Sequence, residues 1–190
     1  MDAEKLMYTP EQDVVIQQAL GYGVELKAYV TSAYSAEQMR EIMWGIIAGV
    51  DIHWYNDPGF NSCQMWQIRE GLKRSLDVSY YANKSFEWGQ MYMIRIGLEA
   101  GMNLSEYVKL GMDRGQLYMI LTGYRMDLDY HLYAKPCYNA QQMEEIEWGL
   151  LDKLDVSSYL DPDLKAVEMR LIRECLKNKK KNACLSKQAS

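Results

Sequence analysis

The chain has 190 residues with a formal net charge of −5, and 48% of them are hydrophobic and 25% charged. This composition excludes general disorder, and no apolar run approaches the roughly 20 residues that a membrane-spanning helix requires. The length suits one domain or at most two small ones, but 15 Tyr, 13 Met and 13 Gly beside only 2 Phe are unusual for an ordinary core.

The unusual composition follows from a repeat of 26 residues. Glutamine recurs at this spacing from Gln12 to Gln142, and Glu168 occupies the next slot. With each glutamine as position 1, isoleucine recurs at position 5, glycine at position 8, an acidic or amide residue at position 14 and tyrosine at position 18. A repeat this short buries its apolar face only by stacking on its neighbours.

Each repeat is expected to form a long helix, a tight turn and a short helix. The residue three places before the glutamine is a good N-cap, and the glutamine completes a capping box. Glycine at position 12 in three repeats marks the end of the long helix, since a left-handed residue commonly follows a helix. The residue at position 14 then caps the short helix. The N-caps are Thr9, Ser35, Asn61, Asp113 and Asn139, and the glycines are Gly23, Gly49 and Gly101.

Glycine at position 8 lies inside the long helix, where it costs about 1 kcal/mol relative to alanine. Five repeats share it, as Gly45, Gly71, Gly97, Gly123 and Gly149. We therefore expect a common cause, namely the close approach of a neighbouring backbone or of the position-18 tyrosine. Tyrosine, unlike phenylalanine, can bury its ring and still place its hydroxyl on a polar partner.

These patterns predict an all-α fold without a sheet, a right-handed α-solenoid of about seven repeats. A single domain is expected over residues 1–176, with repeats starting near 12, 38, 64, 90, 116, 142 and 168 and atypical capping repeats at both ends. Residues 177–190 hold five lysines and no acid, and are expected to form a basic, disordered tail. Since the whole chain carries −5, residues 1–176 carry −10, which argues against a duplex-DNA binder.

The sequence indicates no catalytic site, metal site or cofactor. His53 and His131 are the only histidines and stand three repeats apart, so they cannot share a metal or a catalytic triad. Glu144, Glu145 and Glu147 are expected on an exposed helix flank. The cysteines form no CxxC pair and are expected as free thiols in a cytoplasmic protein. They are Cys63, Cys137, Cys175 and Cys184.

Positions 3 and 6 of the central repeats carry aromatic residues and arginines one helical turn apart. An exposed row of this kind is typical of protein-binding hot spots, and it can also stack single-stranded bases. The alternative is that neighbouring repeats cover this flank and make it a second packing seam. The candidate partner-binding residues are Trp66, Arg69, Tyr92, Arg95, Tyr118 and Arg125.

The segment Gln64–Leu72 (QMWQIREGL), followed by Leu76, Asp77, Val78, Ser79 and Tyr81, resembles a short repeat of proteins from phages and conjugative elements of gut Firmicutes. The resemblance covers about residues 12–160 and brings no catalytic motif with it. It implies a small anti-defence inhibitor of the anti-CRISPR kind. Such a protein acts in the bacterial cytoplasm by binding a protein partner, such as a CRISPR effector nuclease or its ribonucleoprotein. The alternatives are a generic scaffold or self-assembling repeat protein, and a single-stranded nucleic-acid binder.

Overall fold

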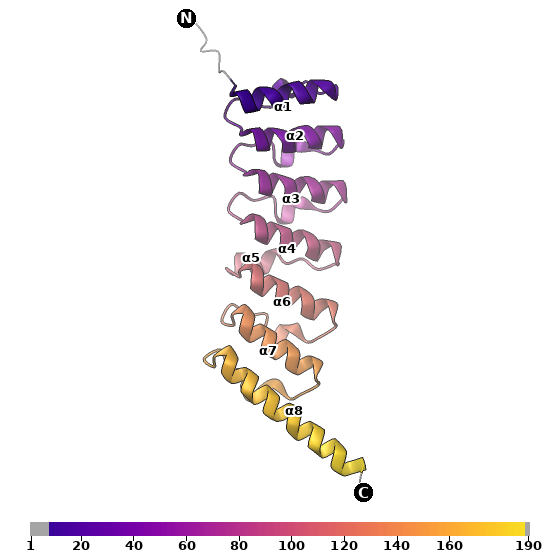
Figure 1. The fold of residues 1–190 in the computed structure, drawn as a ribbon, viewed down its shortest axis with the longest axis vertical. Coiled ribbons are helices and arrows are strands. Elements are labelled where there is room, and N and C mark those ends of the chain that lie inside the picture. The colour runs from indigo at the N-terminus through magenta and orange to yellow at the C-terminus, as the bar shows by residue number, and fades with distance from the viewer. Residues whose placement is uncertain (1–7, 189–190) are drawn as a thin grey trace, which may run out of the picture. The chain divides into compact units, whose positions relative to one another are not determined.

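The computed structural model describes residues 8–188, which form α-helices and short 3₁₀ helices without any strand (Figure 1). The prediction of an all-α fold is confirmed for this part of the chain. The described residues divide into two compact units that meet at Glu99 and Ala100. The sequence predicted one domain over residues 1–176, of which residues 1–7 lie outside the described part. We refer to the N-terminal unit and the C-terminal unit below.

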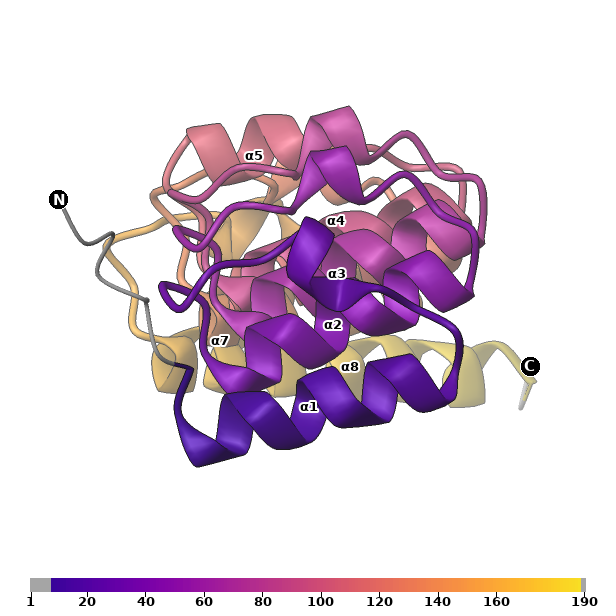
Figure 2. The same ribbon diagram turned by 90° about the horizontal axis from the view of Figure 1, so that it is seen from above.

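The N-terminal unit contains four long helices, each packed on the next. They are α1 (Pro10–Gly21), α2 (Ala36–Ile47), α3 (Ser62–Lys73) and α4 (Trp88–Glu99). Short 3₁₀ helices follow the first three, at Leu26–Ala28, Ile52–Trp54 and Val78–Tyr80. Within this unit the long helices α1, α2 and α3 lie on one side and the 3₁₀ helices on the other (Figure 2).

The C-terminal unit begins with a short helix, α5 (Ser105–Lys109). The long helices α6 (Arg114–Arg125), α7 (Ala140–Leu151) and α8 (Ala166–Gln188) then pack in sequence, with 3₁₀ helices at Tyr130–Leu132 and Val156–Tyr159. Helix α8 continues to Gln188, so the expectation of a disordered tail from residue 177 is wrong up to that residue; residues 189–190 lie outside the described part. One reason is that Lys180 Nζ donates to the carbonyl oxygens of Asp152 and Lys153, both at 2.9 Å.

The capping boxes predicted at the start of five long helices are confirmed. At α3, the backbone N–H of Gln64 donates to Asn61 Oδ1 at 2.9 Å, and Gln64 Oε1 accepts from the backbone N–H of Asn61 at 2.8 Å. The same reciprocal pair begins α1, α2, α6 and α7. These five helices therefore start at the same motif. The long helices of the described part begin 26 residues apart, from Pro10 to Ala166.

The repeated glutamine has a second role that capping does not require. Gln64 Nε2 donates to the carbonyl oxygens of Lys84 at 3.2 Å and Phe86 at 2.7 Å, in the loop that leads into α4. Gln12, Gln38 and Gln142 each bind two carbonyl groups at the same offsets, and Gln116 binds one. An amide supplies both the acceptor and the donor, whereas a carboxylate supplies only the acceptor. This explains why glutamine occupies the slot and not glutamate.

The glycine at position 8 makes room for the tyrosine hydroxyl of the same repeat. In four repeats the Tyr Oη occupies the place where a glycine Cβ would project, for the pairs Gly45–Tyr55, Gly71–Tyr81, Gly123–Tyr133 and Gly149–Tyr159. Tyr81 Oη also donates to the carbonyl oxygen of Gln67 at 3.2 Å. All four rings are fully buried. The predicted close approach of the tyrosine is confirmed at these pairs.

The first repeat shows what happens without the glycine. Alanine stands at position 8 as Ala19, which is fully buried. Its position-18 residue, Tyr29, is 44% exposed, unlike the four tyrosines that face a glycine. A single methyl group at position 8 therefore coincides with a tyrosine that is left at the surface.

The turn after each long helix also follows the predicted pattern. Gly23, Gly49 and Gly101 have φ angles of 76°, 68° and 85°. The same left-handed conformation is adopted at this position by Ser75, Asp127 and Lys153. The short helix that follows is capped as expected where Asp77 Oδ1 accepts from the backbone N–H of Ser79 at 3.1 Å.

Candidate binding surface

Three of the predicted site residues come together in the N-terminal unit. The Cζ atom of Arg95, on α4, lies 5.8 Å from the ring centre of Trp66, on α3, and 5.4 Å from that of Tyr92. A guanidinium at these distances interacts favourably with the electron-rich face of an aromatic ring. Trp66 is 40% exposed but Arg95 only 5%. The aromatic ring is thus presented to solvent, while the arginine that supports it lies inside.

Arg95 is held in place by polar partners from two helices. Its Nε donates to Gln67 Oε1 at 2.9 Å, and its Nη1 donates to Glu99 Oε1 at 2.6 Å. Gln67 is fully buried, and its Nε2 has no hydrogen-bond partner within the described residues. Because the guanidinium is fixed on both sides, the rings that it contacts are fixed with it.

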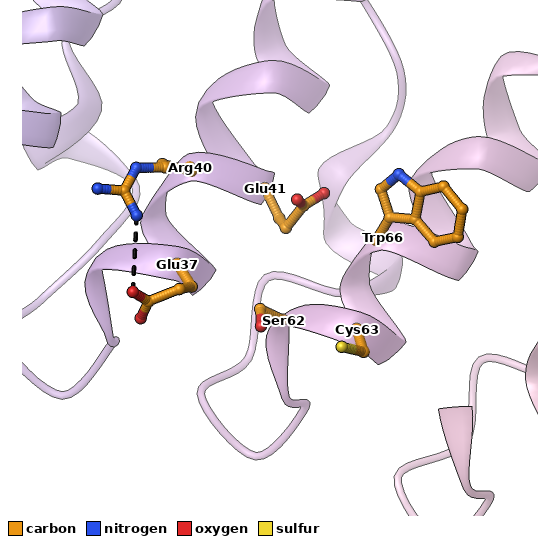
Figure 3. Close-up of a pocket in the computed structure, with 6 residues that line it drawn as sticks. All are labelled: Glu37, Arg40, Glu41, Ser62, Cys63 and Trp66. Atoms are coloured by element: carbon orange, nitrogen blue, oxygen red, sulfur yellow. Dashed lines mark ion pairs between the residues drawn. The ribbon is translucent and has the colours of Figure 1, made fainter. Parts of the chain in front are cut away.

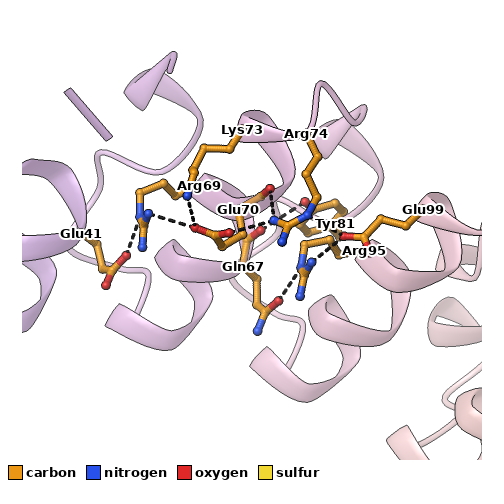
Figure 4. A network of polar contacts seen from close by, with 9 residues as sticks. All are labelled: Glu41, Gln67, Arg69, Glu70, Lys73, Arg74, Tyr81, Arg95 and Glu99. Carbon is orange, nitrogen blue, oxygen red and sulfur yellow. Dashed lines mark hydrogen bonds and ion pairs between the residues drawn. The ribbon is translucent and has the colours of Figure 1, made fainter. Parts of the chain in front are cut away.

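Arg69 belongs to a line of charges that joins α2, α3 and α4 (Figure 4). Its Nε donates to Glu41 Oε2 at 2.9 Å, and its Nη1 donates to Glu70 Oε1 at 3.0 Å. Glu70 also binds Lys73 at 3.0 Å and Arg74 at 2.8 Å. The Nε of Arg74 in turn lies 3.2 Å from Glu99 Oε1, the carboxylate that binds Arg95.

Burial and ion pairing act in opposite directions on the two central carboxylates of this line. Burial raises the pKa of Glu41, and Arg69 offsets only part of that effect. Burial alone would also raise the pKa of Glu70, but its hydrogen bonds with Arg74 and Lys73 lower it overall.

The expectation that Arg69 and Arg95 form an exposed row is wrong, because both guanidinium groups lie in a packing seam between helices.

The seam follows a rule that is present in the sequence but was not predicted from it. An arginine at position 6 binds the polar residue at position 4 of the preceding repeat, 28 residues earlier. In α8, Arg173 Nε donates to Glu145 Oε2 at 2.9 Å. The pairs are Glu41–Arg69, Gln67–Arg95 and Glu145–Arg173. Comparing positions 4 and 6 of neighbouring repeats would have found them.

The acidic flank expected on α7 is exposed only at Glu144. Glu145 is 2% exposed and binds both Arg170 and Arg173, at 2.7 Å and 2.9 Å. Glu147 is also buried and accepts from the hydroxyls of Thr122 and Tyr133, at 2.9 Å and 3.3 Å. The prediction of a solvated face is therefore wrong for these two carboxylates. Burial raises the pKa of Glu147 above its ordinary value.

The remaining two predicted site residues belong to the C-terminal unit. Tyr118 and Arg125 both lie on α6 and are exposed. They are seven residues apart, which places them on the same side of that helix. They are therefore not members of the cluster of Trp66, Tyr92 and Arg95, which belongs to the N-terminal unit.

The N-terminal unit exposes further large apolar residues on its long helices. The rings of Tyr22, at the end of α1, and Trp44, on α2, lie 5.5 Å apart. Ile47 is exposed one turn after Trp44, so it shares the same side of α2. We call Tyr22, Trp44, Ile47 and Trp66 the aromatic surface. Of these four residues, only Trp66 was predicted from the sequence.

A pocket lies beside this surface, between α2 and α3 (Figure 3). It has a volume of about 290 Å³ and is lined by Glu37, Arg40, Glu41, Ser62, Cys63 and Trp66. The Nη1 of Arg40 lies 3.6 Å from Glu37 Oε1, which is a long contact for an ion pair. Two carboxylates, one guanidinium and one indole thus border the same small space.

Other side-chain chemistry is sparse in the described part of the chain. His53 and His131 are both exposed. No group of three or more His, Cys, Asp or Glu side chains that could hold a metal occurs among the described residues, and none of their helices is long and apolar enough to cross a membrane. Cys63, Cys137 and Cys175 are exposed free thiols, and the side chain of Cys184 lies outside the described part. Comparison with protein-family models, curated proteins and solved structures gives no match.

Proposed function

We propose that this protein is a non-enzymatic, right-handed α-solenoid of about seven 26-residue repeats that binds a protein partner through the aromatic surface. The observation that carries the proposal is the exposure of Trp44 and Trp66 on adjacent helices, together with Tyr22 and Ile47. Tryptophan and tyrosine are enriched among the residues that contribute most to protein–protein binding. Exposed aromatic rings that lie close together, as those of Tyr22 and Trp44 do, are also a common mark of an interaction site.

Rigidity of the supporting structure favours this role. Arg95 Cζ lies 5.8 Å from the ring centre of Trp66, and Arg95 is held by Gln67 and Glu99. A side chain that is already ordered before binding loses less conformational freedom when it meets its partner. The buried polar network therefore supports binding, even though its arginines are not themselves available to a partner.

The charge of the N-terminal unit indicates a basic partner. Residues 1–99 contain eight lysines and arginines against thirteen aspartates and glutamates, a net charge of −5 that equals that of the whole chain. A negative field attracts a positively charged protein surface and repels a phosphate backbone. The acidic charge thus favours a protein partner over single-stranded nucleic acid.

We further propose that the partner is a bacterial defence nuclease, such as a CRISPR effector or its ribonucleoprotein, and that the protein is a mobile-element inhibitor acting in the cytoplasm. Two points support this. The repeat resembles those of phages and conjugative elements of gut Firmicutes, and the acidic N-terminal unit is complementary to the basic surfaces with which nucleases hold nucleic acids.

The test is capture of a partner from a bacterial lysate by the wild type and by a Trp44→Ala/Trp66→Ala variant. Since one hot-spot residue contributes about 2 kcal/mol and each 1.4 kcal/mol is about tenfold, the double variant should bind on the order of 1,000-fold more weakly. Trp148→Ala is the matched control, because Trp148 lies on α7 of the C-terminal unit and is 51% exposed. Helical circular dichroism should stay unchanged in both variants.

Full capture by a folded double variant would remove the aromatic surface from the proposal. A nuclease captured by the wild type should lose activity when the purified wild-type protein is added. Unimpaired cleavage would contradict the inhibitor function. Oligomers that grow with concentration would instead favour the self-assembling scaffold. Oligonucleotide binding that weakens steeply with salt would favour the nucleic-acid binder.

A further inference from the structure

We propose that the pocket between α2 and α3 binds an arginine side chain of the protein partner. This inference rests on the proposed protein-binding function and specifies what the partner presents. The pocket is bordered on the α2 side by Glu37, Arg40 and Glu41, and on the α3 side by Ser62, Cys63 and Trp66 (Figure 3).

The residue types on the two walls match the two recognition properties of a guanidinium. Glu37 and Glu41 are one helical turn apart on α2, and both residues line the pocket. Trp66 contributes an aromatic ring on the other wall. A planar guanidinium stacks on aromatic rings and donates to carboxylates in the same plane, whereas a lysine ammonium offers only a point charge. Arginine therefore fits this pair of walls better than lysine.

The protein itself shows that Trp66 accepts a guanidinium. Arg95 approaches the ring from α4, with its Cζ 5.8 Å from the ring centre. Helix α3 packs on α4 and also on α2, and the pocket is lined by residues of α2 and α3. The indole thus contacts the protein's own arginine on its α4 side and borders the pocket on its α2 side.

Charge in and around the pocket favours a cation. The lining contains two carboxylates and one guanidinium, and the surrounding unit carries −5. Arg40 is directed to Glu37 at 3.6 Å, while Glu41 is bound by Arg69 through Oε2. Burial raises the pKa of Glu41 in spite of Arg69, so a second positive charge next to this carboxylate would stabilise its ionised form. An acidic peptide would meet repulsion from both glutamates.

The experiment uses the full chain and a short peptide, acetyl-Gly-Arg-Gly-amide, titrated into the millimolar range because one side chain binds weakly. The chain has five tryptophans, so two-dimensional NMR of the indole N–H groups can follow each of them. The signal of Trp66 should shift and saturate, while that of Trp148 stays in place. A peptide with citrulline, which has nearly the same shape but no charge, should cause no saturating shift. A lysine peptide should bind more weakly than the arginine peptide.

Two variants locate the peptide. Glu37→Gln, at a largely exposed position, should weaken binding roughly threefold, as expected for the loss of one exposed charge pair. Trp66→Leu should abolish saturable binding of the peptide. Because this variant has no Trp66 signal, binding is followed through the backbone amides of Ser62 and Cys63. Glu144→Gln is the control for removing an exposed glutamate elsewhere, and should bind as the wild type does.

Absence of a saturating shift with the arginine peptide, or equal binding of the citrulline peptide, would overturn the inference. These results can be separated from failure of the proposed function. If the arginine peptide does not bind but partner capture still depends on Trp44 and Trp66, only the inference about the pocket fails. If the peptide binds Trp66 but capture is insensitive to both tryptophans, the pocket stands and the proposed function fails.

Discussion

The two units share one set of repeated contacts but differ in the polar groups that they bury between long helices. In the N-terminal unit, arginines at position 6 join α2, α3 and α4 through Glu41, Gln67 and Glu99. In the C-terminal unit, the seam between α6 and α7 buries Glu147, which binds hydroxyl groups of Thr122 and Tyr133. At α8 an arginine again binds position 4 of the preceding repeat.

Comparison of the two units separates the contacts that stabilise the common fold from the features that differ between the units. The capping boxes, the glutamine amides and the Gly–Tyr pairs occur in both units, so they belong to the fold. The arginine pairs of position 6 also occur in both units, since Arg173 binds Glu145. The net charge of −5 and the aromatic surface belong to the N-terminal unit, whereas residues 100–190 contain thirteen basic and thirteen acidic residues and are neutral. The properties that the repeat does not dictate are those that we assign to binding.

The largest expected effect comes from filling the position-8 glycine, which should destabilise either unit. Gly71→Ala and Gly149→Ala each place a methyl group where a tyrosine hydroxyl lies. We expect a loss of about 3 kcal/mol in the free energy of unfolding, from overpacking and a broken hydrogen bond. Urea unfolding followed by circular dichroism measures it, with exposure of the tyrosine as a second readout.

The control is Tyr81→Phe, which removes the hydroxyl and should cost only about 1 kcal/mol. Combined with Gly71→Ala, it should restore part of the lost stability, because the clash involves the removed oxygen. If Gly71→Ala were as stable as the wild type, or if the second change gave no recovery, the hydroxyl would not be the reason for the glycine.

The second comparison is between internal repeats and the last one. Gln64→Glu and Gln142→Glu keep the capping acceptor but lose the Nε2 donor that binds two loop carbonyl groups. Each should destabilise its unit by about 2 kcal/mol, because buried carbonyl oxygens lose their donor and face a carboxylate. Urea unfolding at neutral pH measures the change.

Glu168→Gln provides the matched control at the same position in α8. Glu168 Oε2 accepts from the backbone N–H of Lys165 at 2.7 Å, so the carboxylate already performs the capping half of the role. An amide here should change stability by less than about 0.5 kcal/mol. Equal effects at residues 64, 142 and 168 would contradict a role for the Nε2 donor.

The smallest effect concerns the buried carboxylate of the C-terminal unit. Because the pKa of Glu147 is raised in the folded state, its contribution to stability is fully present below the unfolded value near 4.5 and is lost as pH rises through the folded pKa. Glu147→Gln removes this loss, so the variant should be more stable than the wild type at neutral pH, and this advantage should disappear in acid. Thermal unfolding across the acidic to neutral range measures it.

The opposite exchange in the N-terminal unit, Gln67→Glu, sharpens the contrast. It would convert the bond to Arg95 into an ion pair like Glu41–Arg69, and remove the buried Nε2 that has no partner within the described residues. We expect it to be neutral or stabilising at neutral pH, and to lose any gain in acid. Destabilisation by Glu147→Gln would contradict the cost assigned to the buried carboxylate of the C-terminal unit, and destabilisation by Gln67→Glu would contradict the tolerance for charge assigned to the N-terminal seam.

Periodic signals in the sequence were sufficient to predict the helices, their caps and the close approach of tyrosine to glycine. These features depend on residues within one repeat, such as Asn61 with Gln64 or Gly71 with Tyr81. The second bond of Gln64 was not predicted, since it joins one repeat to the loop before the next.

The candidate site was predicted less well, because exposure depends on how neighbouring helices align. Trp66 and Tyr118 are exposed as expected, but Arg69, Arg95 and Glu145 face polar partners on an adjacent helix. From the sequence of one helix alone, a charged residue is predicted to be exposed. Its burial becomes predictable only when a polar partner on the adjacent helix is considered. The pair of Tyr22 and Trp44 was missed for the same reason, since its members lie in different repeats.

The Gly–Tyr pairs have a consequence for the behaviour of the protein in alkaline solution. Burial raises the pKa of Tyr159 to about 12, and the pKa values of Tyr55, Tyr81 and Tyr133 are raised as well. By contrast, the side chains of tyrosines such as Tyr22 are exposed to solvent. The buried four release their protons only as their helices separate, so the ultraviolet absorbance of tyrosinate records surface titration first and the opening of the repeats afterwards. The residue that closes each repeat is thereby also a natural optical label for its integrity.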